Sequence, residues 1–459
     1  MRQLVLLLYF LTTLNLSVFA GDSLKNTKPN ILVIFTDDQV YRAIAYNNPA
    51  VKTPHLDKLA REGLILNNVY VASPICTASR AAMMSGVYPQ QNGVVALNHK
   101  AFKKYYAGAE RAEQSLPRQM KKAGYHCAFW GKSHIGPPKS YGFDEGEETK
   151  GHDDVETFKR ANSFLQKAAK SSKPFFLWLA PRQPHLPLYP QQKWLDLYNE
   201  NELKLDANYL EEPLPSSVFN QGKPGENFHR DSNYTKVWKK LPGGPPRNEA
   251  TMRSFIKAYY AVISHLDSQV GQMIENMEQL GIKDNTVIVF LSDNGYHLGN
   301  HGLGNKITMH EESVRVPMFI NWSQLTSKGK RSDALVSSLD LYPSLLDLAG
   351  VPLPNHLMGK SLLPIFKDEK ANVRQVVFSE CVGVGAKVGE GHRMARNKKW
   401  KYILTGTDEQ FLYNQSKDPY ELSNQTGKPE QLPILNELKR SMSKWMEQIG
   451  DRKFPHAIK

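Results

Sequence analysis

Short apolar runs alternate with amphipathic stretches along the chain from residue 30 onward. Residues 30–36 and 286–291 are almost continuously apolar, which is typical of strands buried on both faces of a parallel sheet. Strands of this kind alternating with helices predict an α/β fold, with a doubly wound, mostly parallel sheet and helices on both faces. The other predicted strands of this part are 64–71, 125–130 and 175–180, and its helices are 53–63, 115–124, 153–169 and 253–280.

Two stretches depart from this pattern. Residues 200–250 are rich in Pro, Asn, Gly and Lys, which predicts a long surface excursion. After about residue 365 the strands become short and closely spaced, which predicts a smaller C-terminal α+β subdomain with an antiparallel sheet. Its predicted elements are strands at 375–380, 399–404 and 410–414 and a helix at 431–449. The predicted division of the chain is 1–20, 21–367 and 368–459.

The first twenty residues have the layout of a secretory signal peptide. Arg2 supplies the charged start, residues 4–11 form the apolar stretch, and Val18-Phe19-Ala20 ends in a small residue suited to cleavage. The apolar run is shorter than a membrane-spanning helix requires. The sequence therefore predicts cleavage after Ala20, export to the periplasm or the medium, and no membrane anchor on the mature chain.

Composition narrows the classes of function. Of 459 residues, 41% are hydrophobic and 10% aromatic, enough to form a large core and to exclude an intrinsically disordered chain. With 58 Lys and Arg against 45 Asp and Glu, the formal net charge is +13, which indicates an anionic partner or substrate. The chain has no recognition helix, aromatic platform or tract of Lys and Arg, so we predict no nucleic-acid partner.

Three cysteines are few, and odd in number, for an exported chain: Cys76, Cys127 and Cys381. The simplest arrangement is one disulfide and one thiol, and the sequence leaves the pairing open. Cys76 stands among small and polar residues and precedes Arg80 by one helical turn, which indicates a helix N-terminus able to bind anions. The alternative for Cys76 is a buried structural cysteine.

Oxygen-bearing side chains follow two of the predicted central strands. Asp37 and Asp38 come directly after the first strand, and Asp293 and Asn294 follow the strand at 286–291. A single Asp-Asp pair is more often a turn or a helix cap. Two such pairs at the carboxyl edge of a doubly wound sheet instead favour a metal site. Oxygen ligands alone suit Ca²⁺ or Mg²⁺, and a larger ligand shell favours Ca²⁺.

Basic side chains also cluster after predicted strands, at Lys132 and His134 in Gly-Lys-Ser-His, at His185 between two prolines, and at Lys306. Each alone could be a solvated or structurally bonded residue. Three further histidines flank the second acid pair and could either contact substrate or simply belong to a loop: His297, His301 and His310.

Taken together, these motifs resemble those of the sulfatases of the alkaline-phosphatase-like superfamily. The family signature is Cys, any residue, Pro or Ala, any residue and Arg, followed by small residues ending in Thr or Ser and Gly. Cys76-Thr77-Ala78-Ser79-Arg80 with Ser85-Gly86 matches it, although most members carry Pro where this chain has Ala78. The resemblance covers roughly residues 29 to 425. It implies that a formylglycine-generating enzyme oxidises Cys76 to Cα-formylglycine, whose hydrate is the nucleophile.

The resemblance also implies the role of each motif. One Ca²⁺ would be bound by Asp37, Asp38, Asp293, Asn294 and the modified Cys76. Arg80 would steady the formylglycine, Lys132 would hold a sulfate oxygen, and His134 would assist sulfate release. Asp293 would accept the proton of the attacking hydroxyl, and His185 or Lys306 would protonate the leaving alcohol. The domain at 21–367 would be the catalytic one.

The predicted function is therefore hydrolysis of sulfate esters on sulfated carbohydrate, such as glycosaminoglycan or polysaccharide fragments. A phosphonate or phosphate ester hydrolase of the same superfamily is the alternative. Typical phosphatases there carry Ser or Thr as nucleophile and more His and Asp for two metals, so Cys76 and Asn294 speak against it. A glycan-binding protein without activity would be expected only if Cys76 were never converted.

Overall fold

The structure is a computed structural model that describes residues 28–97, 99–211, 248–322, 324, 329–382 and 391–452. The predicted signal segment and most of the predicted surface excursion lie outside the described residues. Within these ranges, no helix has both the length and the apolar character needed to cross a bilayer.

The large sheet has β1 (Asn30–Thr36) at its centre, in parallel pairing with β5 (Phe175–Ala180) and β6 (Thr286–Ser292). The side chains of these three strands are almost wholly buried, as their apolar sequences predict. The register pairs Thr36 with Ser292, so the residues that follow β1 and β6 begin side by side at the carboxyl edge.

Parallel pairing continues on one side of this centre and becomes mixed on the other. β3 (His126–Gly131) pairs parallel with β5 and with β4 (Glu145–Glu148). On the other side, β8 (Met318–Asn321) is antiparallel to both β6 and β2 (Leu64–Tyr70). β2 also pairs with β7 (Arg315–Val316) and, in parallel, with β9 (Lys330–Ser337). The predicted mostly parallel sheet is confirmed.

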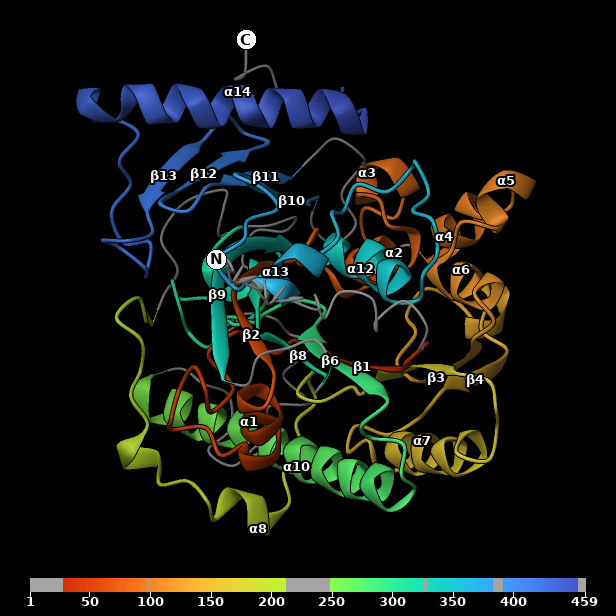
Figure 1. Ribbon diagram of the computed structural model, residues 1–459. Helices are drawn as coiled ribbons and strands as arrows, with labels where there is room; N and C mark the ends of the chain where they lie inside the picture. Colours follow the sequence, from red (N-terminus) through yellow and green to blue (C-terminus); the bar gives the residue numbers. More distant parts are fainter. Residues whose placement is uncertain are drawn as a thin grey trace, which may run out of the picture.

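Helices cover both faces of this sheet (Figure 1). Ile31, Val33 and Phe35 point to the face packed by α2 (Cys76–Ser85), α6 (Leu116–Lys122) and α12 (Leu341–Leu348). Leu32 and Ile34 point to the opposite face, which is packed by α1 (Pro54–Arg61), α7 (Val155–Ala168) and α10 (Glu249–Gln279). This alternation confirms the doubly wound prediction.

A separate four-stranded antiparallel sheet follows, covered by the long helix α14 (Leu432–Ile449) (Figure 1). Its strands are β10 (Val377–Cys381), β11 (His392–Arg396), β12 (Trp400–Thr405) and β13 (Gln410–Asn414). The predicted antiparallel sheet is confirmed, although β11 had not been predicted. The remaining short helices are α3 (Pro89–Asn92), α4 (His99–Tyr105), α5 (Ala109–Ala112), α8 (Gln192–Leu195), α11 (Glu311–Val314) and α13 (Leu363–Lys367).

The three cysteines do not follow the simplest pairing expected from their number. Cys76 begins α2, Cys127 lies in β3, and Cys381 ends β10. All three are buried and no disulfide joins them. Cys127 instead packs in the core with its thiol 3.4 Å from the carbonyl oxygen of Pro117.

Candidate active site

Four acid and amide side chains meet at the carboxyl ends of β1 and β6. Asp37, Asp38, Asp293 and Asn294 are all buried. The backbone N–H of Asp38 donates to Asp293 Oδ1 at 3.1 Å, and Asn294 Nδ2 donates to Asp38 Oδ1 at 2.7 Å. Asp38 has a φ of 65°, a left-handed conformation that Asp tolerates better than most residues. The parallel register therefore brings the two predicted pairs into contact.

The N-terminus of α2 faces the same place. Cys76 is its first residue and is buried, with Sγ 3.1 Å from Nδ1 of His134. One turn later, Arg80 donates through Nε to Asp293 Oδ2 at 2.8 Å and through Nη1 to the carbonyl of Lys132 at 2.6 Å. Arg80 thus fixes α2 against both β6 and the end of β3.

The end of β3 supplies Lys132 and His134. Lys132 Nζ lies 2.5 Å from Asp37 Oδ2, and its backbone N–H donates to the carbonyl of Ala180 at 2.7 Å. Gly131, just before it, has a φ of 116°, and a Cβ there would lie 2.0 Å from the Ala180 oxygen. Only glycine allows β3 to approach β5 this closely while turning Lys132 toward the acids.

Replacing Gly131 with alanine is therefore expected to separate the ends of β3 and β5 and to move Lys132. We expect a loss of about 3 kcal/mol in the free energy of unfolding and a fall in kcat on the order of 100-fold. Urea unfolding and steady-state kinetics measure both. Gly124→Ala is the matched control, because Gly124 also has a positive φ but nothing within 4 Å of an added Cβ. Equal effects of both substitutions would contradict the close-approach argument.

His185 and Lys306 reach the acids from two loops. His185 Nε2 lies 3.7 Å from Asp38 Oδ2, and Lys306 Nζ contacts Asp38 Oδ1. The loop after β5 is held by Asp154, whose two carboxylate oxygens accept the backbone N–H groups of Arg182 and Gln183 at 2.9 and 2.8 Å. Asp154 had no signal in the sequence, because its role depends on a contact between separate elements.

Tyr259 is a second residue that the sequence did not reveal. Its hydroxyl donates to the carbonyl oxygen of Asp38 at 2.5 Å and accepts the backbone N–H of Val40 at 3.1 Å. It projects from α10, where it fits the apolar helical pattern and looks like an ordinary core residue. Together with the side chains of Ser292 and Asp293, which accept the backbone N–H groups of Gln39 and Asp38, it holds the turn that presents Asp38.

Burial and neighbouring charges shift the pKa values of Asp37 and Asp293 in opposite directions. Burial alone would raise the pKa of Asp37, but Lys132, His185, Arg80 and Lys306 outweigh it and hold that pKa well below its usual range. Asp293 differs, because burial and the neighbouring Asp37 raise its pKa well above the usual value. Of these two carboxyl groups, Asp293 has the higher affinity for a proton.

The two basic groups next to Asp38 also differ. Burial and the positive charge of Lys132 lower the pKa of His185 to about 4, so its imidazole is neutral at neutral pH. Burial would lower the pKa of Lys306, but Asp38 and other nearby groups raise it well above its usual range. Lys306 is therefore a fixed positive charge at this edge.

The donor set fits a hard divalent cation. Asp37 Oδ1 and Asn294 Oδ1 are buried and accept no hydrogen bond from the part of the chain that the structure describes. A buried oxygen that accepts no hydrogen bond lowers the stability of the folded protein unless a cation or another donor satisfies it. Carboxylate and amide oxygens are the ligands preferred by Ca²⁺ and Mg²⁺. Asp37, Asp38 and His185 also lie close enough together to share one ion.

The structure thus brings every residue predicted for the site to one edge of the sheet. This set consists of Asp37, Asp38, Cys76, Arg80, Lys132, His134, His185, Asp293, Asn294 and Lys306. A buried cysteine at a helix N-terminus, clustered acids and several cations together suit hydrolysis of an anionic ester.

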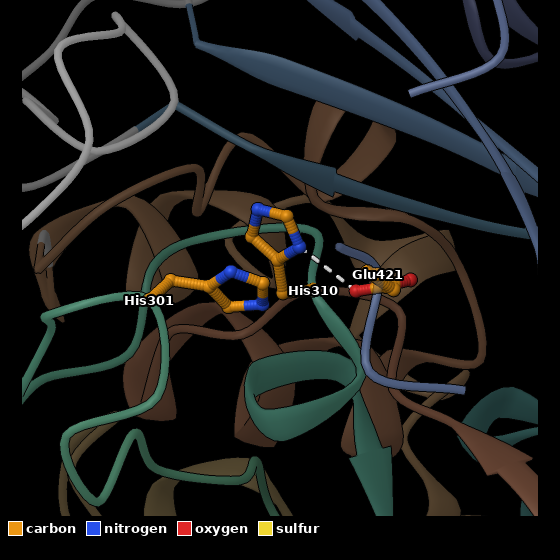
Figure 2. A group of neighbouring side chains, drawn as sticks. All are labelled: His301, His310 and Glu421. Atoms are coloured by element: carbon orange, nitrogen blue, oxygen red, sulfur yellow. Dashed lines mark hydrogen bonds and ion pairs between the residues drawn. The ribbon is translucent and has the colours of Figure 1, made fainter. Parts of the chain in front are cut away.

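The histidines after β6 lie elsewhere. His301 and His310 are buried with their rings stacked 4.1 Å apart, and His310 Nδ1 lies 2.8 Å from Glu421 Oε2 (Figure 2). Their spacing could accommodate a metal ion. However, Lys401 Nζ already lies 2.7 Å from Glu421 Oε1 and 2.6 Å from Glu311 Oε1. A cation beside this ammonium would be repelled, so the group is a buried ion-pair network.

Family models and curated relatives match most of the chain. A model described as Sulfatase matches residues 29–351, and one described as N-sulphoglucosamine sulphohydrolase, C-terminal, matches residues 299–448. An ulvan-active sulfatase of Formosa agariphila is 28% identical over 93% of this chain and 82% of its own length. An N-acetylglucosamine-6-O-sulfatase of Bacteroides thetaiotaomicron is 26% identical over 97% of this chain and 91% of its own length.

A solved structure shows the same fold. The structure of BT4656 in complex with its substrate D-glucosamine-2-N,6-O-disulfate matches with a TM-score of 0.76 at 23% identity. The match covers 93% of this chain and 99% of that chain. The arrangement of the two sheets is therefore common to both proteins.

Proposed function

Because the chain belongs to the sulfatase family and is a sulfuric ester hydrolase, we propose that it removes sulfate from sulfated carbohydrate. The observation that carries this proposal is the arrangement of three cations, Arg80, Lys132 and Lys306, around clustered acids at the N-terminus of α2. A sulfate ester is anionic, and cleavage of its S–O bond develops further negative charge on the departing oxygen. Fixed cations in a buried site stabilise that charge without reorganisation.

We propose further that Cys76 is converted to Cα-formylglycine by a formylglycine-generating enzyme, and that one Ca²⁺ binds Asp37, Asp38, Asp293, Asn294 and the modified Cys76. The unsatisfied oxygens of Asp37 and Asn294 support the cation. When bound, the cation would offset the charge of the acids and polarise the sulfate, and the aldehyde hydrate would supply two hydroxyl groups.

The residues of the chain would then move the protons. Asp293, whose Oδ2 accepts from Nε of Arg80 one turn beyond Cys76, would take the proton of the attacking hydroxyl. His134, 3.1 Å from Cys76 Sγ, is placed to assist the second hydroxyl. Lys132 would hold a sulfate oxygen, and Arg80 would keep the nucleophile oriented. His185 or Lys306 would protonate the leaving alcohol. Both lie beside Asp38, and the negative charge of a bound sulfate ester would raise the pKa of His185 from about 4 and favour its protonated form.

Sulfate release tests the proposal. The mature protein, from a host that converts the cysteine, is incubated with glucosamine sulfates, glycosaminoglycan disaccharides and ulvan oligosaccharides. Ion chromatography measures free sulfate. Matched phosphate and phosphonate monoesters are run in parallel. We expect faster turnover of one or more sulfated sugars. Faster turnover of the phosphonate esters would overturn the proposal in favour of the alternative hydrolase, and turnover of neither would favour a binding protein.

His185→Ala is expected to affect substrates according to their leaving groups. Sugars are poor leaving groups and need a proton, whereas a nitrophenolate does not. We therefore expect kcat to fall by about 100- to 10,000-fold for a sulfated sugar and much less for a nitrophenyl sulfate. Steady-state kinetics on both substrates measure the difference. Equal losses would show that His185 is not the leaving-group acid and would leave that role to Lys306.

We also propose that the chain is exported, with residues 1–20 removed, and that it works in the periplasm or the medium. The strongly positive net charge, +13 for the full chain, fits this setting, because it would steer a free enzyme toward polyanionic glycans. The division into a catalytic domain at 21–367 and a subdomain at 368–459 is part of the same proposal. N-terminal sequencing of the mature protein tests the cleavage, and a start at Gly21 is expected.

A further inference from the structure

The loop that carries Lys306 is bound to the C-terminal sheet by a buried charge network. Residues 305–311, here called the Lys306 loop, run from the region after β6 into α11. At the far end of this loop, Lys401 Nζ donates to the carbonyl oxygen of Met309 at 3.1 Å. Lys401 lies in β12 and its side chain is fully buried. The contact therefore joins the antiparallel sheet to the loop beside the candidate site.

Glu421 forms the second part of this connection. Its Oε2 accepts the backbone N–H of Glu311 at 3.1 Å and lies 2.8 Å from Nδ1 of His310 (Figure 2). Its Oε1 accepts from Lys401 Nζ at 2.7 Å and from Gln415 Nε2 at 2.6 Å. Glu421 is fully buried, so these contacts are not weakened by water. The Glu421 carboxylate thereby holds three successive residues of the loop: His310 and Glu311 directly, and Met309 through Lys401.

The near end of the loop is also bound. The carbonyl oxygen of Asn305 accepts the backbone N–H of His297 at 2.8 Å, and His297 Nε2 lies 2.8 Å from Oγ1 of Thr308. Only Lys306 and Ile307 lie between these two contacts. A displacement of the far end of the loop would therefore reach Lys306 through Thr308 and Ile307.

Ile307 indicates that the loop would not keep this shape unaided. Its φ is 82°, a left-handed conformation that is strongly disfavoured for a β-branched side chain. Such strain persists only where the surroundings over-determine the backbone. Ile307 is buried in the main core, and the residues that follow it are the ones bound by Lys401 and Glu421.

We propose that Glu421 and Lys401 are positioning residues that hold Lys306 against Asp38 by bracing the strained Lys306 loop. The inference rests on the proposed function, since it gives the C-terminal sheet a part in the same reaction. Neither residue touches the acids at the end of β1. They act through the backbone of Met309 to Glu311, and the catalytic consequence depends on Lys306 itself.

A double-mutant cycle tests this. Glu421→Gln keeps the shape of the side chain but removes the charge and one acceptor. We expect kcat for a sulfated sugar, whose leaving group needs a proton, to fall about 10- to 100-fold, with little change in KM. In a Lys306→Ala background, the same substitution is expected to lower kcat no further, because the group being positioned is gone. Hydrogen exchange in residues 305–311 should become faster in Glu421→Gln.

A buried ion pair between β11 and the segment after α14 gives the matched control. Asp451 Oδ2 accepts from Arg393 Nε at 2.6 Å, and among the described residues Asp451 makes no contact with the Lys306 loop. Asp451→Asn should leave kcat and exchange in the loop unchanged. If Glu421→Gln alone folds poorly, the combination Lys401→Met with Glu421→Gln removes both charges and is expected to give the same kinetics.

Two outcomes would overturn the inference. One is an equal fold-loss from Glu421→Gln with and without Lys306, and the other is unchanged exchange in the loop. Failure of the proposed function is seen separately, as a wild-type protein that releases no sulfate. In that case the exchange measurement, which needs no turnover, still decides the inference.

Discussion

Replacing Cys76 with alanine is expected to lower kcat on the order of a million-fold, the loss typical of removing a covalent nucleophile. Cys76 is the first residue of α2 and lies 3.1 Å from His134, at the edge where Arg80 meets Asp293. Of the three cysteines, Cys76 is the one that lies at this edge. The site would keep its charges but lose the group that attacks sulfur.

Cys127→Ala is the matched control for this substitution. Cys127 is also a buried cysteine, but it lies in β3 with its side chain in the core. We expect slightly lower stability and full activity. Mass analysis of the peptide spanning Glu62 to Arg80 should show the aldehyde or its hydrate in active wild-type protein. An unmodified thiol in a fully active preparation, or an active Cys76→Ala variant, would contradict the nucleophile assignment.

Sequence patterns predicted those elements whose burial depends on apolar side chains. β1, β5 and β6 appear in the sequence as apolar runs because both of their faces are covered. β11 does not form an apolar run in the sequence, because its buried side chains include His392 and Arg393. Arg393 is buried in an ion pair with Asp451. A polar side chain buried by a partner far along the chain leaves no mark in the local hydrophobic pattern.

The same distinction applies to the candidate site. The acids after β1 and β6 could be grouped from the sequence, since parallel strands end at one edge. Asp154, Tyr259 and Glu421 could not, because each acts through a backbone group on a different element. From the sequence, His310 could either contact substrate or belong to a loop. Its contact with Glu421, more than a hundred residues later in the chain, places it in the buried ion-pair network.

Asp38→Asn is expected to cause the second large loss, by removing the cation together with the activity. Asn is chosen because it tolerates the left-handed backbone at this position, where φ is 65°. The change removes one negative charge from a group of oxygen ligands, and it also weakens the contact with Lys306. We expect calcium affinity to fall by at least about 100-fold and kcat by about 1,000-fold.

Elemental analysis of the dialysed protein measures the metal, and Asp57→Asn serves as the control. Asp57 is a buried acid that pairs with Arg61 on α1, away from the sheet edge. The control should retain calcium and activity, and added Ca²⁺ should partly restore Asp38→Asn. A variant that keeps a full complement of calcium but loses activity would contradict the ligand assignment. Because Asp38 also contacts Lys306, that result would mean that its carboxylate serves to orient the lysine, and the oxygens of Asp37, Asp293 and Asn294 would have to hold the cation alone.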